Sequence, residues 1–565
     1  MNEPRRRGPI VRLVVGLWDA MNFTRRLFFN LLFFGVLIFL LAVLAAGDGA
    51  LPLQDRTTLV IAPEGQLVEQ YSSDPASRAL ARMYGDPGAG EVRLRDLLRA
   101  IGAAKDDERI ERVLLRVDGL RFSGHAALRE LVAAVRALRA SGKQVVAYGE
   151  AFDQQQYLLA AQADEVYLDP MGGVLLEGLS GHRQYFREGL QDKLGVDVHL
   201  FKVGEYKAAA EPFVRDSASP ESKEADLYWM NDVWQRFLGD VATARKLDVA
   251  QLAEGIATLP QGIEAAGGDL ARYALDESLV DGLKTEEQVD ALLVERGVAD
   301  ENSEKGFRSI SMDAYLAHVD RGIAAVDERP QVAVVVAEGS IVGGEQPPGT
   351  IGGDSTSALL RAARDDEAVK AVVLRVDSPG GEVFASEQIR REVELLKAAG
   401  KPVVASMGDY AASGGYWIAM DADRIYANAS TVTGSIGIFG LVPTFQRSLD
   451  KIGVHTDGVG TTRFAGAFDV TRELDPEVGR VVQSVIEKGY RDFIGRVARA
   501  RGMEVPEVDA VARGRVWTGA QARQRGLVDE FGGLREAVAD AAARAGLEDE
   551  GDYRVHYLDQ DASPF

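Results

Sequence analysis

The chain contains a long internal duplication, and this feature constrains its fold more than any other. Residues 111–119 (ERVLLRVDG) resemble residues 370–378 (KAVVLRVDS), and four further pairs of similar segments follow in the same order. These pairs are 138–149 with 396–408, 163–170 with 422–429, 192–199 with 450–457, and 278–283 with 526–531. The offset between partners stays between 248 and 259 residues, which is far too long for a solenoid repeat. The sequence therefore predicts two copies of one domain.

Each copy alternates strand-like and helix-like stretches. RVLLRV at 112–117 and AVVLRV at 371–376 are short apolar runs of the kind found in buried parallel strands. Residues 127–143 and 386–401 have the apolar spacing of helices and end in Gly-Lys, and a second strand-like run follows each of them. This alternation predicts an α/β domain for each copy.

The pattern divides the chain into six parts. We predict a basic cytoplasmic N-terminus at 1–26, a transmembrane anchor at 27–46, a first repeat at 55–297, a linker at 298–329, a second repeat at 330–548 and a tail at 549–565. The linker is polar and weakly patterned, apart from MDAYLAHV at 312–319, which could form a helix.

The segment 27–46 (LFFNLLFFGVLIFLLAVLAA) carries no charge and is long enough to cross a bilayer. The residues before it include six arginines against only Glu3 and Asp19. By the positive-inside rule that end lies in the cytoplasm, which places the large domains outside the inner membrane. A cleaved signal peptide is the alternative, since AVLA at 42–45 offers a small-residue pattern. We favour the anchor because the apolar core is longer than in most signal peptides.

The composition excludes several functions. The 64 basic and 86 acidic residues give a net charge of −22, which argues against nucleic acid as the main partner. Because the chain has no cysteine, disulfides, thiolate chemistry and cysteine-ligated metal sites are ruled out.

Two glycine-containing motifs occur in the second copy only. In GDYAASGGYW at 408–417, Ser413 and the two glycines that follow it lie opposite three glutamines, 154–156, of the first copy. Likewise, SPGG at 378–381 lies opposite GLRF at 119–122. Acyl transfer requires backbone N–H groups aimed at a developing oxyanion, and glycine permits the close approach this needs. Each motif alone could be a turn or a small-residue packing contact, but their joint presence in one copy favours a catalytic site with Ser413 as nucleophile.

A serine nucleophile needs a base. None of the six histidines lies in a recognisable triad motif, although triad partners can be distant in sequence, so a His–Asp pair stays open. A second candidate is Lys207 in FKVGEYKAAAEPF at 201–213, which has no lysine counterpart in the matching region 457–477. Burial among apolar groups could lower the pKa of Lys207 enough for it to act as a base, whereas a solvated surface lysine could not.

Four motifs carry a family resemblance: LRVDSPGG at 374–381, YAASGGYWIAM at 410–420, TVTGSIGIFG at 431–440 and EYKAAAEPF at 205–213. Together they resemble the long, duplicated form of the signal peptide peptidase A (protease IV) family, with EYKAAAEPF in the first copy and the other three in the second. The resemblance runs from the membrane anchor to near the C-terminus. It implies two tandem domains with a Clp-protease/crotonase-like fold after one N-terminal transmembrane helix.

The resemblance also assigns roles to residues. It implies that Ser413 is the nucleophile and Lys207 the general base, so that each copy supplies one member of a single dyad. It implies an oxyanion hole made of the N–H groups of Gly381 and Gly414, and a hydrogen bond from Ser435 that orients the lysine. No metal or other cofactor is implied.

The family forms an oligomer, tetrameric in the long form, on the outer face of the inner membrane, where it degrades cleaved signal peptides. We therefore expect a membrane-anchored serine endopeptidase that acts on short apolar peptides. Two alternatives are a membrane-anchored oligomeric scaffold that binds peptides without cutting them, and crotonase-type acyl-CoA chemistry. The presence of Ser413, both glycine pairs and Lys207 argues against the scaffold, and the outward topology and the Ser/Lys split argue against the acyl-CoA reaction.

Overall fold

The structure is a computed structural model that describes residues 9–47, 53–74, 77–78, 90–321 and 327–559. It separates into two units, residues 1–55 and 56–565. The first contains one helix, α1 (Pro9–Gly47), whose window Leu13–Ile38 has a mean hydropathy of 1.3 and is long enough to cross a bilayer. The predicted anchor at 27–46 lies inside α1. The helix begins earlier than the anchor because residues 9–24 are also largely apolar and contain no internal proline. Residues 1–8, with three of the six arginines, lie outside the described residues.

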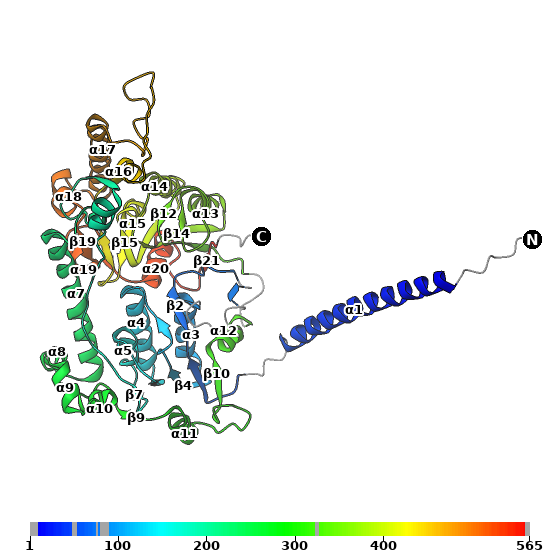
Figure 1. Cartoon of the computed structure of the whole chain (residues 1–565). Helices are drawn as coiled ribbons and strands as arrows, with labels where there is room; N and C mark the ends of the chain where they lie inside the picture. The colour runs from blue at the N-terminus through cyan, green and yellow to red at the C-terminus, as the bar shows by residue number, and fades with distance from the viewer. Residues whose placement is uncertain (1–8, 48–52, 75–76, 79–89, 322–326, 560–565) are drawn as a thin grey trace, which may run out of the picture. The chain divides into compact units, whose positions relative to one another are not determined.

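In the second unit, the first repeat is built on a parallel sheet of six strands (Figure 1). In sheet order these are β10 (Ser309–Ser311), β1 (Thr57–Ile61), β4 (Ile110–Leu115), β6 (Gln144–Gly149), β7 (Glu165–Leu168) and β9 (Gly282–Leu283). A small parallel sheet lies beside it, with the order β3 (Glu91–Arg93), β2 (Gly65–Val68) and β5 (Leu120–Arg121). The sequence predicted strands at 112–117 and 144–148. These two runs correspond to β4 and β6, which are neighbouring central strands of the sheet.

The first repeat also contains one π-helix and several α-helices. They are α3 (Leu94–Asp106), α4 (Ala126–Ala140), α5 (Gln154–Ala160), the π-helix η1 (Glu188–Leu194), α6 (Glu211–Val214), α7 (Pro220–Arg245), α8 (Val249–Ala257), α9 (Leu259–Ala265), α10 (Leu270–Asp276), α11 (Glu286–Arg296) and α12 (Met312–Arg321). The segment 298–329, which we predicted to be a linker, supplies both β10 and α12. Because β10 pairs with β1, this segment adds an edge strand to the first sheet.

The second repeat contains an eight-stranded sheet. Its strands are β19 (Val516–Thr518), β17 (Val432–Gly434), β15 (Val403–Ala412), β14 (Val369–Ser378), β11 (Gln331–Glu338) and β21 (Arg554–Tyr557). In addition, β16 (Arg424–Ala427) pairs with β15, and β20 (Glu530–Phe531) pairs with β16. Strands β12 (Ile341–Val342) and β13 (Ile351–Gly352) form a separate pair. Strand β21 lies within residues 549–565, which we predicted to be a tail, and extends the sheet at β11.

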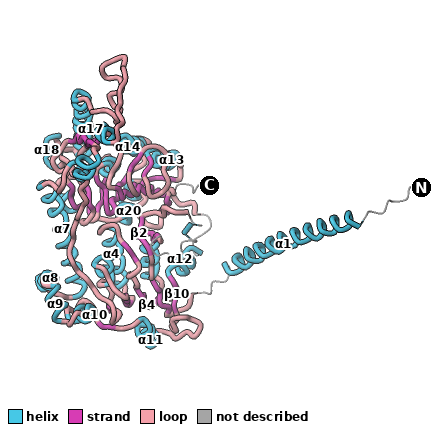
Figure 2. Tube along the Cα trace, viewed as in Figure 1, coloured by secondary structure: helices cyan, strands magenta, loops and turns pink. Residues whose placement is uncertain are grey.

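Buried apolar side chains of the second repeat form two core clusters, one on each face of this sheet. Figure 2 shows the helices and strands that carry them. Its helices are α13 (Gly353–Asp365), α14 (Val383–Ala398), α15 (Gly414–Ala419), α16 (Gln446–Lys451), α17 (Pro476–Arg501), α18 (Val505–Val511), α19 (Gly519–Gln524) and α20 (Leu534–Arg544). Along β11, Val332 and Val334 pack against α20, whereas Ala333 and Val335 belong to the opposite cluster with α14 and α17. Alternate residues of one strand thus fill two cores, which is why these strands read as continuous apolar runs. The predicted fold class, two tandem α/β domains after an N-terminal apolar helix, is confirmed.

A two-stranded ribbon joins the repeats. Strand β8 (Asp197–Lys202) of the first repeat pairs in antiparallel fashion with β18 (Phe439–Thr444) of the second, with Lys202 opposite Phe439 and Asp197 opposite Thr444. The ribbon directs the chain after Lys202 toward the second repeat.

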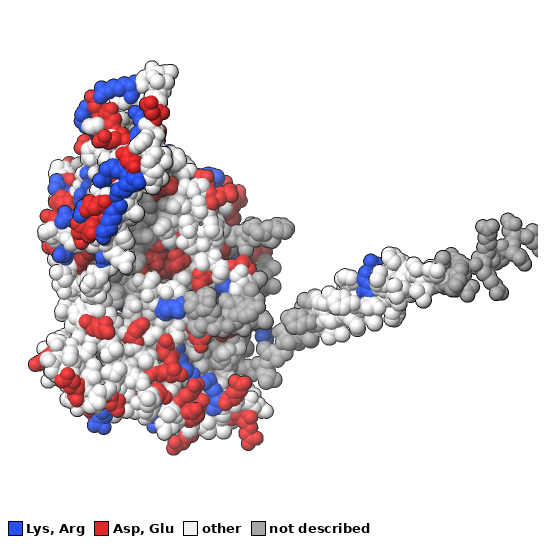
Figure 3. Space-filling view, viewed as in Figure 1, with Lys and Arg blue, Asp and Glu red and all other residues white. Residues whose placement is uncertain are grey.

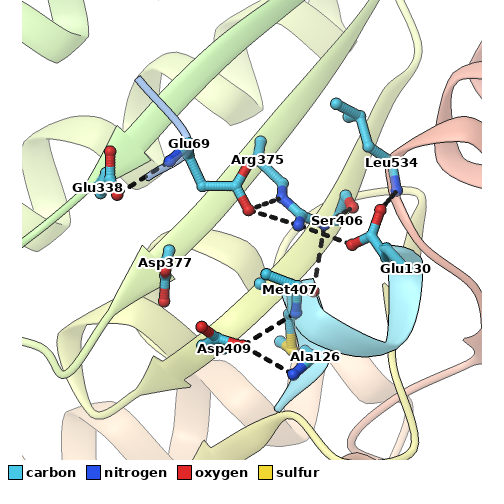
Figure 4. Close-up of polar contacts among 12 residues, drawn as sticks. Glu69, Ala126, Glu130, Glu338, Arg375, Asp377, Ser406, Met407, Asp409 and Leu534 are labelled. Carbon is cyan, nitrogen blue, oxygen red and sulfur yellow. Dashed lines mark hydrogen bonds and ion pairs between the residues drawn. The ribbon is translucent and has the colours of Figure 1, made fainter. Parts of the chain in front are cut away.

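A buried ionic cluster also joins the repeats (Figure 4). Arg375 on β14 is fully buried, and its guanidinium lies 2.9 Å from a carboxylate oxygen of Glu69 and 2.7 Å from one of Glu130 on α4. Both carboxylates belong to the first repeat. Burial raises the pKa of Glu130, although the charge of Arg375 acts against that rise. One buried cation of the second repeat therefore neutralises acidic groups of the first.

The neighbouring strand has its own contact with the first repeat. Asp409 on β15 accepts hydrogen bonds from the N–H groups of Ala126 (2.7 Å) and Ala127 (3.0 Å) and from the hydroxyl of Ser123 (2.8 Å). A carboxylate at the N-terminus of α4 is favoured by the unpaired amides and dipole of that helix. Strands β14 and β15 are thus each held by the first repeat a few residues before they end.

The buried cluster around Arg375 predicts that substitutions of two arginines will differ in their effect on the stability of the protein. Replacing Arg375 by Met leaves Glu69 and Glu130 buried without their cation, so we expect the free energy of unfolding to fall by about 3–5 kcal/mol. The matched control is Arg116→Met at the corresponding position of the first repeat, where Arg116 pairs with Glu286 in a partly exposed site and the loss should be about 1 kcal/mol or less. Urea unfolding followed by circular dichroism measures both, and equal losses would contradict the role given to Arg375.

Candidate active site

Ser413 occupies a sharp turn between β15 and α15. Its φ of 54° lies in the left-handed region, which is strained for a residue with a side chain. The turn is held because the Ser413 N–H donates to the carbonyl of Gly434 at 2.8 Å and the Ser413 carbonyl accepts from the N–H of Trp417 at 2.9 Å. The side chain is partly exposed while its neighbours on both sides are buried. A hydroxyl presented in this way is accessible to a substrate.

The SPGG loop closes directly on this turn. Gly380 has a φ of 110°, and a Cβ at this position would lie only 2.8 Å from both the nitrogen of Gly414 and the Cβ of Ser413. A Cβ on Gly381 would lie 1.9 Å from the carbonyl oxygen of Ile341. Any side chain at either position would therefore force the loop away from Ser413.

The same approach brings two amides together. A Cβ on Gly414 would lie 3.0 Å from the nitrogen of Gly381, so the backbone amide of Gly381 lies close to Gly414. Within the described residues, neither of these N–H groups donates to a protein acceptor. They are the two amides that the family resemblance implies for an oxyanion hole.

Lys207 reaches this site from the first repeat. It lies in the turn between β8 and α6, and the residue is 4% exposed. Its Nζ is 3.0 Å from Ser413 Oγ, 2.9 Å from the Ser435 carbonyl oxygen and 3.0 Å from Ser435 Oγ. The structure thus brings Lys207, Ser413 and Ser435 into one hydrogen-bonded group, although Lys207 and Ser413 are 206 residues apart.

Burial lowers the pKa of Lys207 to about 7, from its usual 10.5. The groups that contact Nζ are hydroxyl and carbonyl oxygens, which carry no formal charge to stabilise the ammonium. A large fraction of this lysine is therefore neutral near pH 7 and can accept a proton.

Ser435 presents two oxygens to the lysine because its backbone is unusual. Its φ is 49°, and its N–H donates to the carbonyl of Arg515 at 2.7 Å. This conformation allows the carbonyl and hydroxyl of one residue to contact the same Nζ.

Three further glycines shape the path of Lys207, and our reading of the sequence did not single them out. A Cβ on Gly514, whose φ is 81°, would lie 2.6 Å from the Lys207 nitrogen, and one on Gly437 would lie 3.2 Å from Lys207 Cδ. A Cβ on Gly204 would lie 2.2 Å from the carbonyl oxygen of Arg513. Gly437 lies inside the TGSIG motif and could have been noticed, whereas Gly514 has no local signal, since its partner is about 300 residues away.

The histidines do not take part in this site. All six histidines are among the described residues, and in this part of the chain it is Lys207 that forms the hydrogen bond with Ser413 Oγ. His199 lies near Thr444, and His455 near Asp450. The alternative of a His–Asp pair therefore has no geometric support. No cluster of three or more histidine and acidic side chains in this part of the chain could hold a metal ion.

The first repeat has a different structure at the position that corresponds to Ser413 of the second repeat. Residues 154–156 form the start of α5, where the side chain of Asp153 accepts from two backbone N–H groups and caps the helix. Beside them is a cavity of about 620 Å³ lined by residues that include Phe152, Gln154, Met171 and Leu270. This cavity contains no serine or lysine that could act as nucleophile or base.

Comparison with known proteins identifies the class and the family. Residues 137–297 and 395–548 match the model of peptidase family S49. Protease 4 of Salmonella typhi is 42% identical over 537 residues, covering 94% of this chain and 85% of the relative. The chloroplastic serine protease SPPA of Arabidopsis thaliana is 30% identical over 451 residues, covering 78% of this chain and 64% of the relative.

Among solved structures, a mutant of ClpP1 from Listeria monocytogenes aligns with 36% of this chain and 94% of its own, at 15% identity and a TM-score of 0.25.

The family match and the similar proteases show that the chain is a serine peptidase. It belongs to peptidase family S49, in agreement with the resemblance to signal peptide peptidase A and protease IV.

The glycine contacts predict a specific loss of activity. Gly514→Ala would push a Cβ into the backbone of Lys207, and because a displacement of about 1 Å can cost about 100-fold in rate, we expect a loss of at least that size. The matched control is Gly502→Ala, which also has a positive φ of 64° but has open space around it. Peptide hydrolysis by both variants, with melting temperatures for comparison, measures the effect. Equal activity in the two variants would contradict it.

Proposed function

We propose that this chain hydrolyses peptide bonds with a dyad in which Lys207 of the first repeat deprotonates Ser413 of the second. The observation that carries the proposal is the 3.0 Å contact between Lys207 Nζ and Ser413 Oγ, made by a lysine that is 4% exposed. A buried amine with a lowered pKa, at hydrogen-bond distance from a partly exposed hydroxyl, is the arrangement that general-base catalysis requires.

In this mechanism, Ser413 Oγ attacks the scissile carbonyl carbon while its proton moves to Lys207 Nζ. The carbonyl oxygen becomes an oxyanion and accepts hydrogen bonds from the N–H groups of Gly381 and Gly414. The tetrahedral intermediate then expels the amine, which takes the proton from Lys207, and an ester to Ser413 is left. Water, deprotonated by the same lysine, attacks this ester and releases the second product.

Ser435 acts as a positioning residue in this scheme. Its carbonyl and hydroxyl oxygens fix two directions around Nζ, which leaves the third hydrogen-bonding direction for Ser413. The lysine is then held in the orientation needed for proton transfer without a nearby carboxylate, which would raise its pKa.

We propose that the substrates are cleaved signal peptides and other short apolar peptides. Val383 and Phe384 are exposed directly after the oxyanion loop, and they offer an apolar surface to a peptide bound there. Helix α1 would hold the enzyme in the inner membrane, with the N-terminus in the cytoplasm and both repeats on the outer face. A homotetramer is the assembly that the family resemblance implies.

Substitution of the dyad tests the proposal. Lys207→Ala and Ser413→Ala should each lower hydrolysis of a synthetic signal peptide by at least about 1000-fold, because each removes a group that acts in the transition state. The matched control is Lys223→Ala, an exposed lysine on α7, which should retain normal activity. Circular dichroism checks that the variants fold. Hydrolysis that persists in either variant would remove that residue from the mechanism, and inactive wild-type protein would favour the peptide-binding scaffold.

The pKa of Lys207 predicts the pH dependence. The lysine is a base only when neutral, and its pKa of about 7 means that the neutral fraction falls as pH drops below 7. The rate at which a fluorophosphonate labels Ser413 should therefore fall about tenfold per pH unit below 7 and level off above it. A labelling rate that keeps rising up to about pH 10 would indicate an unperturbed lysine, and a constant rate would exclude Lys207 as the base.

A further inference from the structure

The turn that carries Lys207 has little regular structure of its own. Residues 203–210 lie between β8 and α6 and form neither helix nor strand. The N–H of Lys207 donates to the carbonyl of Gly204 at 3.4 Å, which is long for a hydrogen bond between backbone groups. The position of Lys207 is therefore set mainly by the groups that pack against this turn.

Some of these groups belong to a three-residue segment of the second repeat that joins α18 to β19. We call residues 513–515 the clamp. The carbonyl of Arg513 accepts a hydrogen bond from the N–H of Tyr206 at 3.2 Å. The carbonyl of Arg515 accepts one from the N–H of Ser435 at 2.7 Å. The clamp thus holds the residue that precedes the lysine in the sequence and also the residue whose oxygens contact the lysine Nζ.

The side chain of Arg515 adds a contact that the backbone does not supply. The central carbon of its guanidinium lies 4.7 Å from the ring centres of both Tyr206 and Trp517. Its Nη2 is 2.8 Å from one carboxylate oxygen of Glu224 on α7, and the hydroxyl of Tyr206 donates to the other oxygen at 3.3 Å. One guanidinium of the second repeat therefore binds the neighbour of Lys207 and a helix of the first repeat together.

Burial distinguishes Arg515 from the other arginine of the clamp. The side chain of Arg515 is 15% exposed, and a guanidinium that stacks on aromatic rings away from water is bound more strongly than one in solvent. The side chain of Arg513 is 49% exposed and pairs with Glu205 at 3.1 Å, and exposed ion pairs contribute little. Of the two side chains, that of Arg515 has the larger part in holding the turn.

Exposed pairs of the second kind are common on this part of the surface. Figure 3 shows basic and acidic side chains close to one another in the region of the view where Figure 1 labels α17 and α18. The contacts of Arg515 differ from these because they combine burial, two rings and a carboxylate in one place. A lysine at this position would keep the charge but would lose the planar group that stacks.

The contacts of the turn also bear on the chemistry of Lys207. Burial is the cause of its lowered pKa, so the amine stays a base near pH 7 only while the turn stays packed against the second repeat. If the turn moved outward, water would reach Nζ and the pKa would rise. The distance from Nζ to Ser413 Oγ would increase as well.

We propose that Arg515 is a positioning residue for Lys207. Its guanidinium holds Tyr206 and Glu224 of the first repeat, so that the Lys207 turn stays packed against the second repeat. Arg515 takes no part in the reaction itself, and it acts by keeping the lysine buried and within hydrogen-bond distance of Ser413. The inference rests on the proposed function, because it takes Lys207 as the base.

The pH dependence of Ser413 labelling by a fluorophosphonate tests the proposal in the full-length protein. In Arg515→Met the turn loses its stacked cation and water gains access to Lys207. The midpoint of the labelling profile should then move from about pH 7 toward the higher pKa of a solvated lysine. With a peptide substrate, kcat should fall about tenfold or more while KM changes less, because a small displacement of a catalytic group lowers mainly the rate of the chemical step.

The matched control is Arg525→Met. In the part of the chain that the structure describes, the Arg525 guanidinium lies 3.7 Å from the ring centre of Trp517 and contacts Tyr228 and the Gln521 carbonyl, not the Lys207 turn. This variant removes an arginine from the same ring, but it should keep the wild-type midpoint and kcat. Equal changes in Arg515→Met and Arg525→Met would overturn the proposal, because the effect would then be a general loosening around Trp517.

Glu224→Gln gives a second variant that does not disturb a buried group. The side chain of Glu224 is 57% exposed, so the variant should fold normally, which melting temperatures check. It weakens the attachment of Arg515 and should move the labelling midpoint in the same direction by a smaller amount. A wild-type midpoint near pH 7 that both variants share would overturn the role of Arg515 alone. A wild-type rate that does not vary with pH would instead remove Lys207 as the base, and the proposed mechanism with it.

Discussion

The hydrogen bond between Lys207 Nζ and Ser413 Oγ links the two repeats at the candidate active site, and the chemistry of that site depends on it. A lysine that approaches a serine from solvent would stay protonated and would not serve as a base. Here the amine is buried and has oxygen partners without formal charge, so its pKa falls to about 7. The two residues come from different repeats, and the site therefore exists only while both repeats keep their relative position.

Several contacts maintain that position. The β8–β18 ribbon directs the Lys207 turn across the boundary, and Gly204 and Gly514 allow the backbones to meet there. Arg375 ties β14 to the first repeat, and Asp409 ties β15 to it four residues before Ser413. These polar contacts are buried, so removing one partner would leave the other buried without a partner, at a large cost in free energy. Such contacts therefore favour one relative position of the two repeats.

The cluster around Arg375 contains more acid than base. Burial raises the pKa of Glu338 to about 7, and it raises that of Asp377 as well. Glu338 accepts hydrogen bonds from the N–H groups of Glu69 and Gln70, so its carboxyl is satisfied in place. The boundary between the repeats thus holds carboxyls that ionise less readily than exposed ones.

Much of the fold could be predicted from the sequence because its signals are local. The repeated segments gave the duplication, the apolar runs gave the strands, and the glycines of SPGG and ASGG marked the turn at Ser413. Contacts between distant segments could not be predicted in this way. The ribbon pairing and the capping of α4 by Asp409 join residues more than 200 positions apart, and β21 lies in a segment that we had predicted to be a tail. Lys207 was a candidate only because the second repeat has no lysine at the matching position and because of the family resemblance. Its neighbours in the sequence alone do not show that its side chain is buried.

Complementation between inactive variants would test most directly whether one chain contains the whole dyad. Lys207→Ala and Ser413→Ala proteins are coexpressed and purified together, and peptide hydrolysis is compared with that of wild type coexpressed with the double variant. If Lys207 serves the Ser413 of its own chain, the coexpressed single variants stay inactive while the control retains activity in proportion to its wild-type chains. Activity restored in the mixed single variants would mean that the base and the nucleophile come from different copies, and it would contradict the geometry described above.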